Sequence, residues 1–189
     1  MRIITGSARG VRLETLSGEA TRPTSERAKE AIFSMLGLGF EGRRVLDLFA
    51  GSGQMGLEAI SRGAQSATLV DASRAALEVV RRNAERTKLA ARVRPVCSDA
   101  LSYLKSNADQ PFHLVFLDPP YHAGLLPASL RLLKEKHLLA PGAILVCESA
   151  SHEDVFGSDE ALAAQFGVLK RTRYGIAHVT ILKNEEGIE

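Results

Sequence analysis

The sequence predicts an α/β fold built around a mostly parallel sheet, and three observations support this prediction. From about Arg43 onward, short apolar runs alternate with amphipathic ones, which is the pattern of repeated βα units. A glycine-rich loop follows the first apolar run, and acidic residues end or follow four of the runs. The 189 residues, 45% of them hydrophobic, are enough for one globular domain.

The expected elements of this repeat follow from the residue pattern. The predicted strands are the apolar runs at residues 44–49, 67–70, 92–97, 112–117 and 143–147. The predicted helices cover residues 56–62, 73–87, 100–105 and 125–137, with Ser73 as the N-cap of the longest. Two further strand-like runs, residues 167–174 and 176–182, meet at Gly175 and predict an antiparallel hairpin on the sheet edge.

The first 44 residues are of a different kind. Residues 2–5 and 11–13 flank a Gly-Ser-Ala-Arg-Gly turn and predict a small β-hairpin. Residues 22–25 open a helix that Gly37 ends, and its expected apolar face is Ala28, Ile32, Met35 and Leu36. A doubly wound sheet does not need this segment. We therefore divide the chain into an extension, residues 1–40, that contacts a partner, and a domain of residues 41–189.

Charge is distributed unevenly along the chain. The net charge is +2, but residues 1–44 hold eight Lys and Arg against five Glu, and the rest holds 16 against 17. A basic extension suits contact with nucleic-acid phosphates, although scattered arginines on a solvated surface explain the charge equally well. The candidate phosphate contacts are Arg2, Arg9, Arg12, Arg22 and Arg27.

The loop after the first strand reads Asp-Leu-Phe-Ala-Gly-Ser-Gly over residues 47–53, and Gly56 completes a Gly-x-Gly-x-x-Gly pattern. That pattern also fits dinucleotide binding. Four acids at the carboxyl ends of the strands would repel a pyrophosphate and suit a cationic cofactor such as S-adenosylmethionine. These acids are Asp47, Asp71, Asp99 and Asp118.

Each expected cofactor contact has a structural alternative. Asp71 is placed to accept both ribose hydroxyls, or else only accompanies the Ser73 cap. Asp99 would accept from the adenine amino group, or else cap the helix that starts at Ala100. Asp47 would meet the cofactor or hold the glycine loop through backbone N–H groups. The full expected set is Asp47, Phe49, Gly51, Gly53, Asp71, Asp99 and Ala100.

The tetrapeptide Asp118-Pro119-Pro120-Tyr121 closes the apolar run at residues 112–117 and carries the expected reaction. Its prolines remove two backbone donors, so nearby carbonyls stay free to accept hydrogen bonds. If Asp118 and the Pro119 carbonyl accept the two hydrogens of an exocyclic amine, its lone pair turns toward a methyl group. Tyr121 would stack on the base. The alternative is a Pro-Pro turn with a capping aspartate.

Other chemistries find less support in the sequence. The five histidines have no metal-ligand spacing, so no metal is expected, and no nucleophile-elbow pattern suggests a hydrolase. Cys97 and Cys147 lie in strand-like runs and read as buried free thiols of a reducing compartment. No apolar stretch approaches the roughly 20 residues that span a bilayer, and the first residues form no long apolar run, so we do not expect a secretory signal. We expect a cytoplasmic protein that does not contact membranes.

With both motifs placed, nearly the whole chain resembles the RsmD family of 16S rRNA guanine-N2 methyltransferases. The matching motifs are the basic start at residues 2–10, Arg22-Pro23-Thr24, the glycine loop with residues 56–59, and Asp118–Tyr121. The resemblance implies a seven-stranded, Rossmann-like class I methyltransferase fold with S-adenosyl-L-methionine as donor. It also implies that a guanosine of 16S rRNA, in an assembled or partly assembled small ribosomal subunit, is the acceptor. Asp71 stands where the family often has Glu, Gln54-Met55 replaces a small-apolar pair, and Thr5 replaces a common Gly.

Two other functions remain open at this stage. The tetrapeptide also fits amino-group methylation of DNA adenine or of a protein glutamine, although no separate target-recognition domain is visible. A non-catalytic RNA-binding assembly factor could keep the fold, but it predicts erosion of the cofactor motifs, and these are intact.

Overall fold

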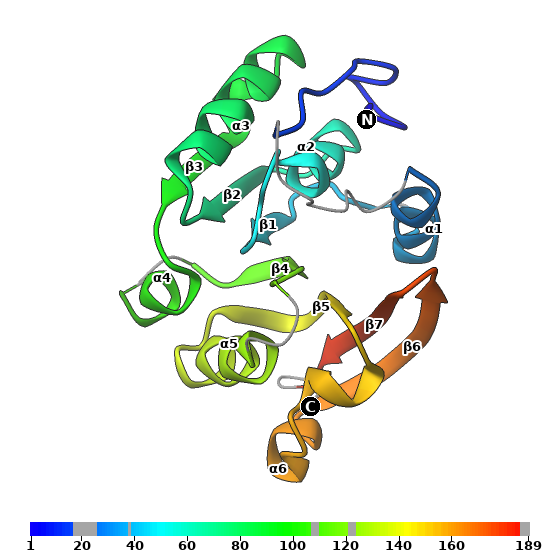
Figure 1. Ribbon diagram of the computed structural model, residues 1–189, viewed down its shortest axis with the longest axis vertical. Coiled ribbons are helices and arrows are strands. Elements are labelled where there is room, and N and C mark those ends of the chain that lie inside the picture. The colour runs from blue at the N-terminus through cyan, green and yellow to red at the C-terminus, as the bar shows by residue number, and fades with distance from the viewer. Residues whose placement is uncertain (17–25, 38, 107–109, 121–123, 186–189) are drawn as a thin grey trace. The chain divides into compact units, whose positions relative to one another are not determined.

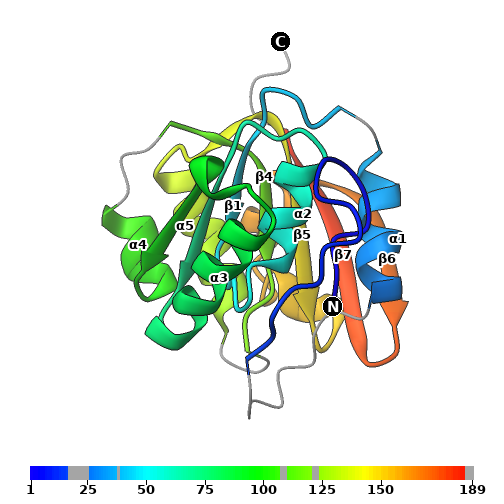
Figure 2. The ribbon, with the colours of Figure 1, turned by 90° about the horizontal axis from the view of Figure 1, so that it is seen from above.

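The computed structural model describes residues 1–16, 26–37, 39–106, 110–120 and 124–185 (Figures 1 and 2). The chain forms two compact units, Met1–Ser98 and Asp99–Glu189. Its strands form a seven-stranded sheet in the order β3-β2-β1-β4-β5-β7-β6, which confirms the predicted mostly parallel α/β fold with a C-terminal antiparallel hairpin. None of the helices in the described ranges is long and apolar enough to cross a membrane.

The described residues of the first unit form three parallel strands and three α-helices. Its elements are α1 (Glu26–Leu36), β1 (Arg44–Asp47), α2 (Gln54–Ser61), β2 (Ser66–Asp71), α3 (Arg74–Arg86), the 3-10 helix η1 (Ala90–Arg92) and β3 (Val93–Cys97). β2 pairs in parallel with both β1 and β3. Val45 and Leu46 of β1 and Leu69 of β2 have no exposed surface, and helices α2 and α3 pack on these strands.

Helix α3 forms where the sequence predicts it. The Ser73 hydroxyl accepts a hydrogen bond from the Ala76 N–H at 3.2 Å, which satisfies one of the free donors of the first turn. Leu77, Val80 and Ala84 are buried on one face, as their spacing requires. Thr87 ends the helix.

The second unit holds the remaining four strands. Its elements are α4 (Ala100–Ser106), β4 (Phe112–Leu117), α5 (Leu125–Glu135), β5 (Leu139–Ser149), η2 (His152–Val155), α6 (Glu160–Ala163), β6 (Phe166–Tyr174) and β7 (Ala177–Asn184). β4 and β5 are parallel, whereas β7 runs antiparallel to both β5 and β6. The β6–β7 hairpin turns at Gly175 and leaves β6 at the sheet edge, as expected.

Three local expectations were wrong. β5 begins at Leu139 rather than at residue 143, because a register shift against β4 lets the strand pass through Pro141 and Gly142. Cys97 is exposed, since β3 is an edge strand, whereas Cys147 is buried and both thiols are free. Helix α1 buries Lys29 and Phe33 with Ala28 and Ile32, in place of Met35 and Leu36.

The N-terminal segment, residues 1–16, pairs with itself as predicted. Arg2 and Arg12 form an isolated antiparallel bridge, the Ile3 N–H donates to the Val11 carbonyl at 3.0 Å, and the Gly10 N–H donates to the Ile3 carbonyl at 2.8 Å. The segment lies against α2 and α3 within the first unit (Figures 1 and 2).

Candidate functional site

The glycine loop, residues 48–53, joins β1 to α2. Gly51 (φ +52°) and Gly53 (φ +79°) have left-handed backbone conformations that other residues rarely adopt. A Cβ on Gly53 would lie 2.8 Å from the Leu69 side chain, so this glycine is needed for packing of the loop on β2. A Cβ on Gly51 would meet nothing within 4 Å. The bare backbone of Gly51 therefore faces open space, where a ligand can approach it.

Asp71, at the end of β2, fixes the shape of this loop. One carboxylate oxygen accepts from the Gly51 N–H at 2.9 Å and the other from the Ser73 N–H at 2.8 Å. The alternative to ribose binding, a partner of the Ser73 cap, is thus present in the structure. It does not exclude ribose binding, because Asp71 is only half-buried and each carboxylate oxygen can accept a second hydrogen bond.

Asp47, at the end of β1, is 4% exposed and accepts a hydrogen bond from the Gly56 N–H at 3.0 Å. It therefore holds the first turn of α2, directly after the glycine loop that it was expected to hold or to present to the cofactor. Burial raises the pKa of Asp47 from its ordinary value of 3.8 to about 7. The Gly56 hydrogen bond opposes this shift and the negative charge of Asp71 adds to it.

Asp47→Asn is expected to change how stability depends on pH. The pKa of Asp47 is raised in the folded state, so its stabilising contribution is complete below pH 3.8 and is lost as the pH rises toward 7. The amide keeps an acceptor for Gly56 and does not titrate. The variant should therefore gain about 2–4 kcal/mol over the wild type between pH 4.5 and 8, measured by urea unfolding. Parallel pH curves for the two proteins would contradict this.

In the second unit, Asp99 caps α4, the alternative considered for it. Its carboxylate accepts from the Ser102 N–H at 2.9 Å, and hydrogen bonds from Ser102 hold the pKa of Asp99 below its ordinary value. Asp99 is exposed, and Ala100 beside it is 7% exposed. Phe49, in the first unit, is half-buried. No contact here assigns a cofactor to these three residues, so their cofactor roles remain predictions.

The predicted catalytic tetrapeptide directly follows β4. Leu117 has no exposed surface, Asp118 and Pro120 are exposed, and Pro119 is buried. The chain thus presents a carboxylate at the carboxyl end of a buried strand and anchors it with the proline that follows. Tyr121 lies outside the described residues, so its stacking role stays a prediction.

The described arginines among the predicted phosphate contacts, Arg2, Arg9, Arg12 and Arg27, are all exposed. Arg2 forms an ion pair with Glu26 at 3.5 Å. Within the described ranges, Arg9 and Arg12 have no ion-pair partner. Arg22 lies outside the described residues.

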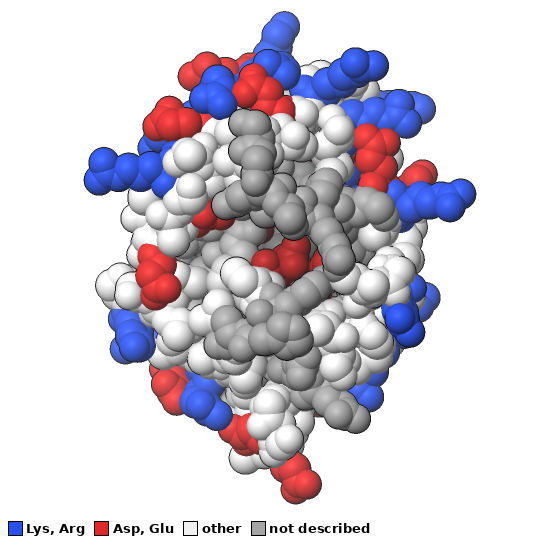
Figure 3. Space-filling view, in the orientation of Figure 1, with Lys and Arg blue, Asp and Glu red and all other residues white. Residues whose placement is uncertain are grey.

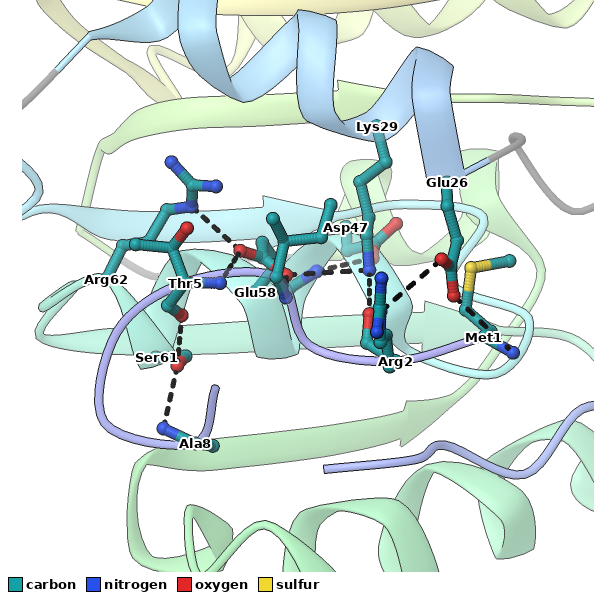
Figure 4. Close-up of polar contacts among 12 residues, drawn as sticks. Met1, Arg2, Thr5, Ala8, Glu26, Lys29, Asp47, Glu58, Ser61 and Arg62 are labelled. Atoms are coloured by element: carbon teal, nitrogen blue, oxygen red, sulfur yellow. Dashed lines mark hydrogen bonds and ion pairs between the residues drawn. The ribbon is translucent and has the colours of Figure 1, made fainter. Parts of the chain in front are cut away.

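A buried carboxylate that the sequence analysis missed holds the N-terminal segment (Figure 4). Glu58 of α2 has no exposed surface and accepts from the Ile4 and Thr5 N–H groups at 2.8 and 3.0 Å. Arg62 donates to it at 2.8 Å, and the buried ammonium of Lys29 lies 3.5 Å away. Burial lowers the pKa of Lys29, and the charge of Glu58 opposes that shift. Two helices and the N-terminal segment thus meet at one carboxylate.

The turn of the segment also fits closely over the end of α2 (Figure 4). The Ala8 N–H donates to the Ser61 hydroxyl at 3.0 Å, and that hydroxyl donates to the Thr5 carbonyl at 2.6 Å. Gly6 has φ +89°, and a Cβ there would lie 1.8 Å from the Ser61 carbonyl oxygen. Only glycine allows this approach.

A second feature missed by the sequence analysis is the row of arginines on α3 beside the segment. Glu14 pairs with Arg82 at 2.8 Å and with Arg86 at 2.6 Å, and Arg86 also donates to the Arg12 carbonyl at 3.5 Å. Figure 3 shows basic and acidic side chains interspersed at the top of the view, over α3 and the segment. In the sequence, the adjacent arginines at residues 81–82 could have indicated this row of arginines on α3.

Strand order, the glycine loop after β1 and the proline motif after β4 together define a class I methyltransferase fold. Residues 1–183 match the family model described as "Conserved hypothetical protein 95". The chain is 32% identical to ribosomal RNA small subunit methyltransferase D of Haemophilus influenzae, over 97% of this chain and 94% of that protein. The chain therefore belongs to the RsmD family, as its motifs suggested.

Solved structures agree with this fold. That of yhhF from Escherichia coli superposes with a TM-score of 0.85 at 34% identity and covers 98% of both chains. A Thermus thermophilus 16S rRNA N2 G1207 methyltransferase (RsmC), in complex with AdoMet and guanosine, has a TM-score of 0.69 at 23% identity. It covers 89% of this chain and 45% of that one, and shows the fold alone.

Proposed function

We propose that this protein transfers a methyl group from S-adenosylmethionine to the N2 amine of a guanosine in 16S rRNA of the small ribosomal subunit, in the cytoplasm. The observation that carries the proposal is the exposed Asp118 at the carboxyl end of buried β4, followed by the anchored Pro119. The names of two similar proteins, a small-subunit rRNA methyltransferase and an N2 guanine methyltransferase, support the choice of acceptor.

The residues of the glycine loop suit a cationic donor. Gly51 opens its backbone to a ligand, and Asp71 retains acceptor capacity beside it. In the described part of the chain, the buried Oε1 atom of Gln54 has no hydrogen-bond partner, so a ligand N–H can satisfy it. Within the described residues no cluster of three or more His, Cys, Asp or Glu could hold a metal ion.

Bound S-adenosylmethionine supplies an electrophilic methyl group on a sulfonium. The chain's own residues prepare the nucleophile, because the lone pair of a guanine amine is delocalised into the ring. Asp118 and the Pro119 carbonyl accept hydrogen bonds from the two amine hydrogens, which turns the lone pair out of the ring plane, and Tyr121 stacks on the base. The one proton that the nitrogen must lose on methylation passes to the Asp118 carboxylate and from there to solvent. Most of the acceleration comes from positioning, where about 7–11 kcal/mol is available.

Exposed arginines of the N-terminal segment, Arg9 and Arg12 above all, bind rRNA phosphates in this proposal. Because the amine must enter a pocket, the target guanosine lies in a loop or is flipped out of its helix.

The test is methyl transfer from labelled S-adenosylmethionine to small subunits from cells that lack this protein. We expect one modified guanosine, located by mass spectrometry as N2-methylguanosine, and no label in DNA or release factors. Naked 16S rRNA and partly assembled subunits, assayed in parallel, identify the substrate form. Label in DNA adenine or in a protein glutamine would show that the acceptor is that amino group and not the proposed guanosine of 16S rRNA. Donor binding without label in any substrate would favour an assembly factor.

A further inference from the structure

One buried amide on α3 contacts both of the segments to which the proposed function assigns ligands. Asn83 has no exposed surface. Its Oδ1 atom accepts from the Glu14 N–H at 2.8 Å, and its Nδ2 atom donates to the Glu14 carbonyl at 3.0 Å. The same Nδ2 atom donates to the Ser52 carbonyl of the glycine loop at 3.0 Å.

These three bonds use both donors and the acceptor of the amide. Both partners are backbone groups, so Asn83 fixes the path of the chain rather than a flexible side chain. The Glu14 backbone is held from both its N–H and its carbonyl, as in a strand pair. A buried backbone carbonyl or N–H that loses its partner costs free energy, so neither segment can move away from Asn83 without penalty.

The fixed positions lie next to the groups proposed to bind ligands. Ser52 lies between Gly51 and Gly53, the two left-handed residues of the glycine loop. Glu14 lies two residues after Arg12, whose carbonyl accepts from Arg86. A shift of Ser52 therefore displaces the donor loop, and a shift of Glu14 displaces the arginines that face rRNA.

We propose that Asn83 is a positioning residue that couples the donor loop to the RNA-contacting N-terminal segment, so that ordering of either segment favours ordering of the other. The ligands at the two ends rest on the proposed function, but the coupling of the two segments does not. By linkage, a donor that orders the glycine loop then raises affinity for rRNA, and rRNA raises affinity for the donor by the same factor.

The experiment compares Asn83→Ala and Asn83→Asp with the wild-type protein. Alanine removes all three bonds, whereas aspartate keeps the shape and the acceptor for Glu14 but loses both donations. Amide hydrogen exchange, read by mass spectrometry on the ligand-free protein, should accelerate in residues 10–16 and in residues 48–53 together. S-adenosylmethionine should protect both segments in the wild type, but only the glycine loop in the variants. Affinity for the donor and for 16S rRNA should each fall about five- to tenfold.

Thr87→Val is the matched control, because Thr87, the C-cap residue of α3, is also buried and its hydroxyl donates to the Asn83 and Ala84 carbonyls of that helix. It should lower stability without changing either affinity or the donor-induced protection of residues 10–16. Arg9→Ala with Arg12→Ala should weaken RNA binding alone and lower its log–log salt slope by about 0.7 for each phosphate that the variant no longer binds.

Two results would overturn the coupling: exchange in the Asn83 variants that matches Thr87→Val, or acceleration in one segment only. If the wild-type protein binds neither S-adenosylmethionine nor rRNA, the proposed function fails. In that case, hydrogen exchange of the ligand-free wild type and Asn83 variants still tests whether Asn83 couples the two segments.

Discussion

Asp118→Ala is expected to lower the rate of methyl transfer by about 10²–10³-fold while donor binding and folding stay unchanged. The effect is of the size seen when one group that stabilises a transition state is removed from an enzyme. Asp118 is exposed after β4, so its loss leaves the core intact and changes the free energy of unfolding by no more than about 1–1.5 kcal/mol, the contribution of one surface interaction. Single-turnover transfer to small subunits measures the rate, and calorimetry measures the donor affinity.

Two variants make this result specific. Asp118→Asn retains one acceptor oxygen and should lose less activity than alanine. Asp159→Ala removes another carboxylate of the second unit, one that caps α6 by accepting from the Leu162 N–H at 2.9 Å. It should cost about 1 kcal/mol of stability and leave methyl transfer intact. Equal rates of methyl transfer for Asp118→Ala and Asp159→Ala would show that Asp118 takes no part in the reaction.

Glu58→Leu is expected to destabilise the protein by about 3–5 kcal/mol, the largest stability change we predict. The substitution leaves the ammonium of Lys29, which has no exposed surface, without its counter-charge. It also removes the acceptor of the Ile4 and Thr5 N–H groups, so the N-terminal segment loosens from α2. Urea unfolding followed by circular dichroism measures the loss.

Glu78→Ala is the matched control, because Glu78 pairs with Arg81 on the exposed face of α3. An exposed ion pair of this kind contributes about 0.2–1 kcal/mol. The double variant Glu58→Leu with Lys29→Met removes the unpaired charge and should recover part of the stability. A loss at Glu58 no larger than that at Glu78 would show that the buried network does not hold the unit together.

The fold was predictable from the sequence because its signals are local. Ser73 marks the start of α3 by a hydrogen bond three residues away, and the apolar run of β4 matches the observed strand from Phe112 to Leu117. Where a signal was ambiguous, the prediction failed. Pro141 and Gly142 resemble a chain turn, yet β5 continues through them with a register shift, which depends on pairing with a distant strand.

The supporting residues of the candidate site were not predictable in this way. Lys29 and Glu58 lie on amphipathic helices, where charged residues usually face solvent, and their burial depends on partners 29 residues apart in sequence. Asn83 is 69 residues from Glu14 and 31 from Ser52, and an asparagine within a helix carries no local sign of such contacts. By contrast, Asp47 and Asp71 were found because strand ends are visible in the sequence.

Because Gly6 has no side chain, the turn of the N-terminal segment can pack closely against the end of α2. An alanine there would have to lift the whole turn, tilting Arg9 and Arg12 away from their present places. If the turn binds rRNA as proposed, a substitution at residue 6 should therefore weaken RNA binding before it changes the rate of methyl transfer.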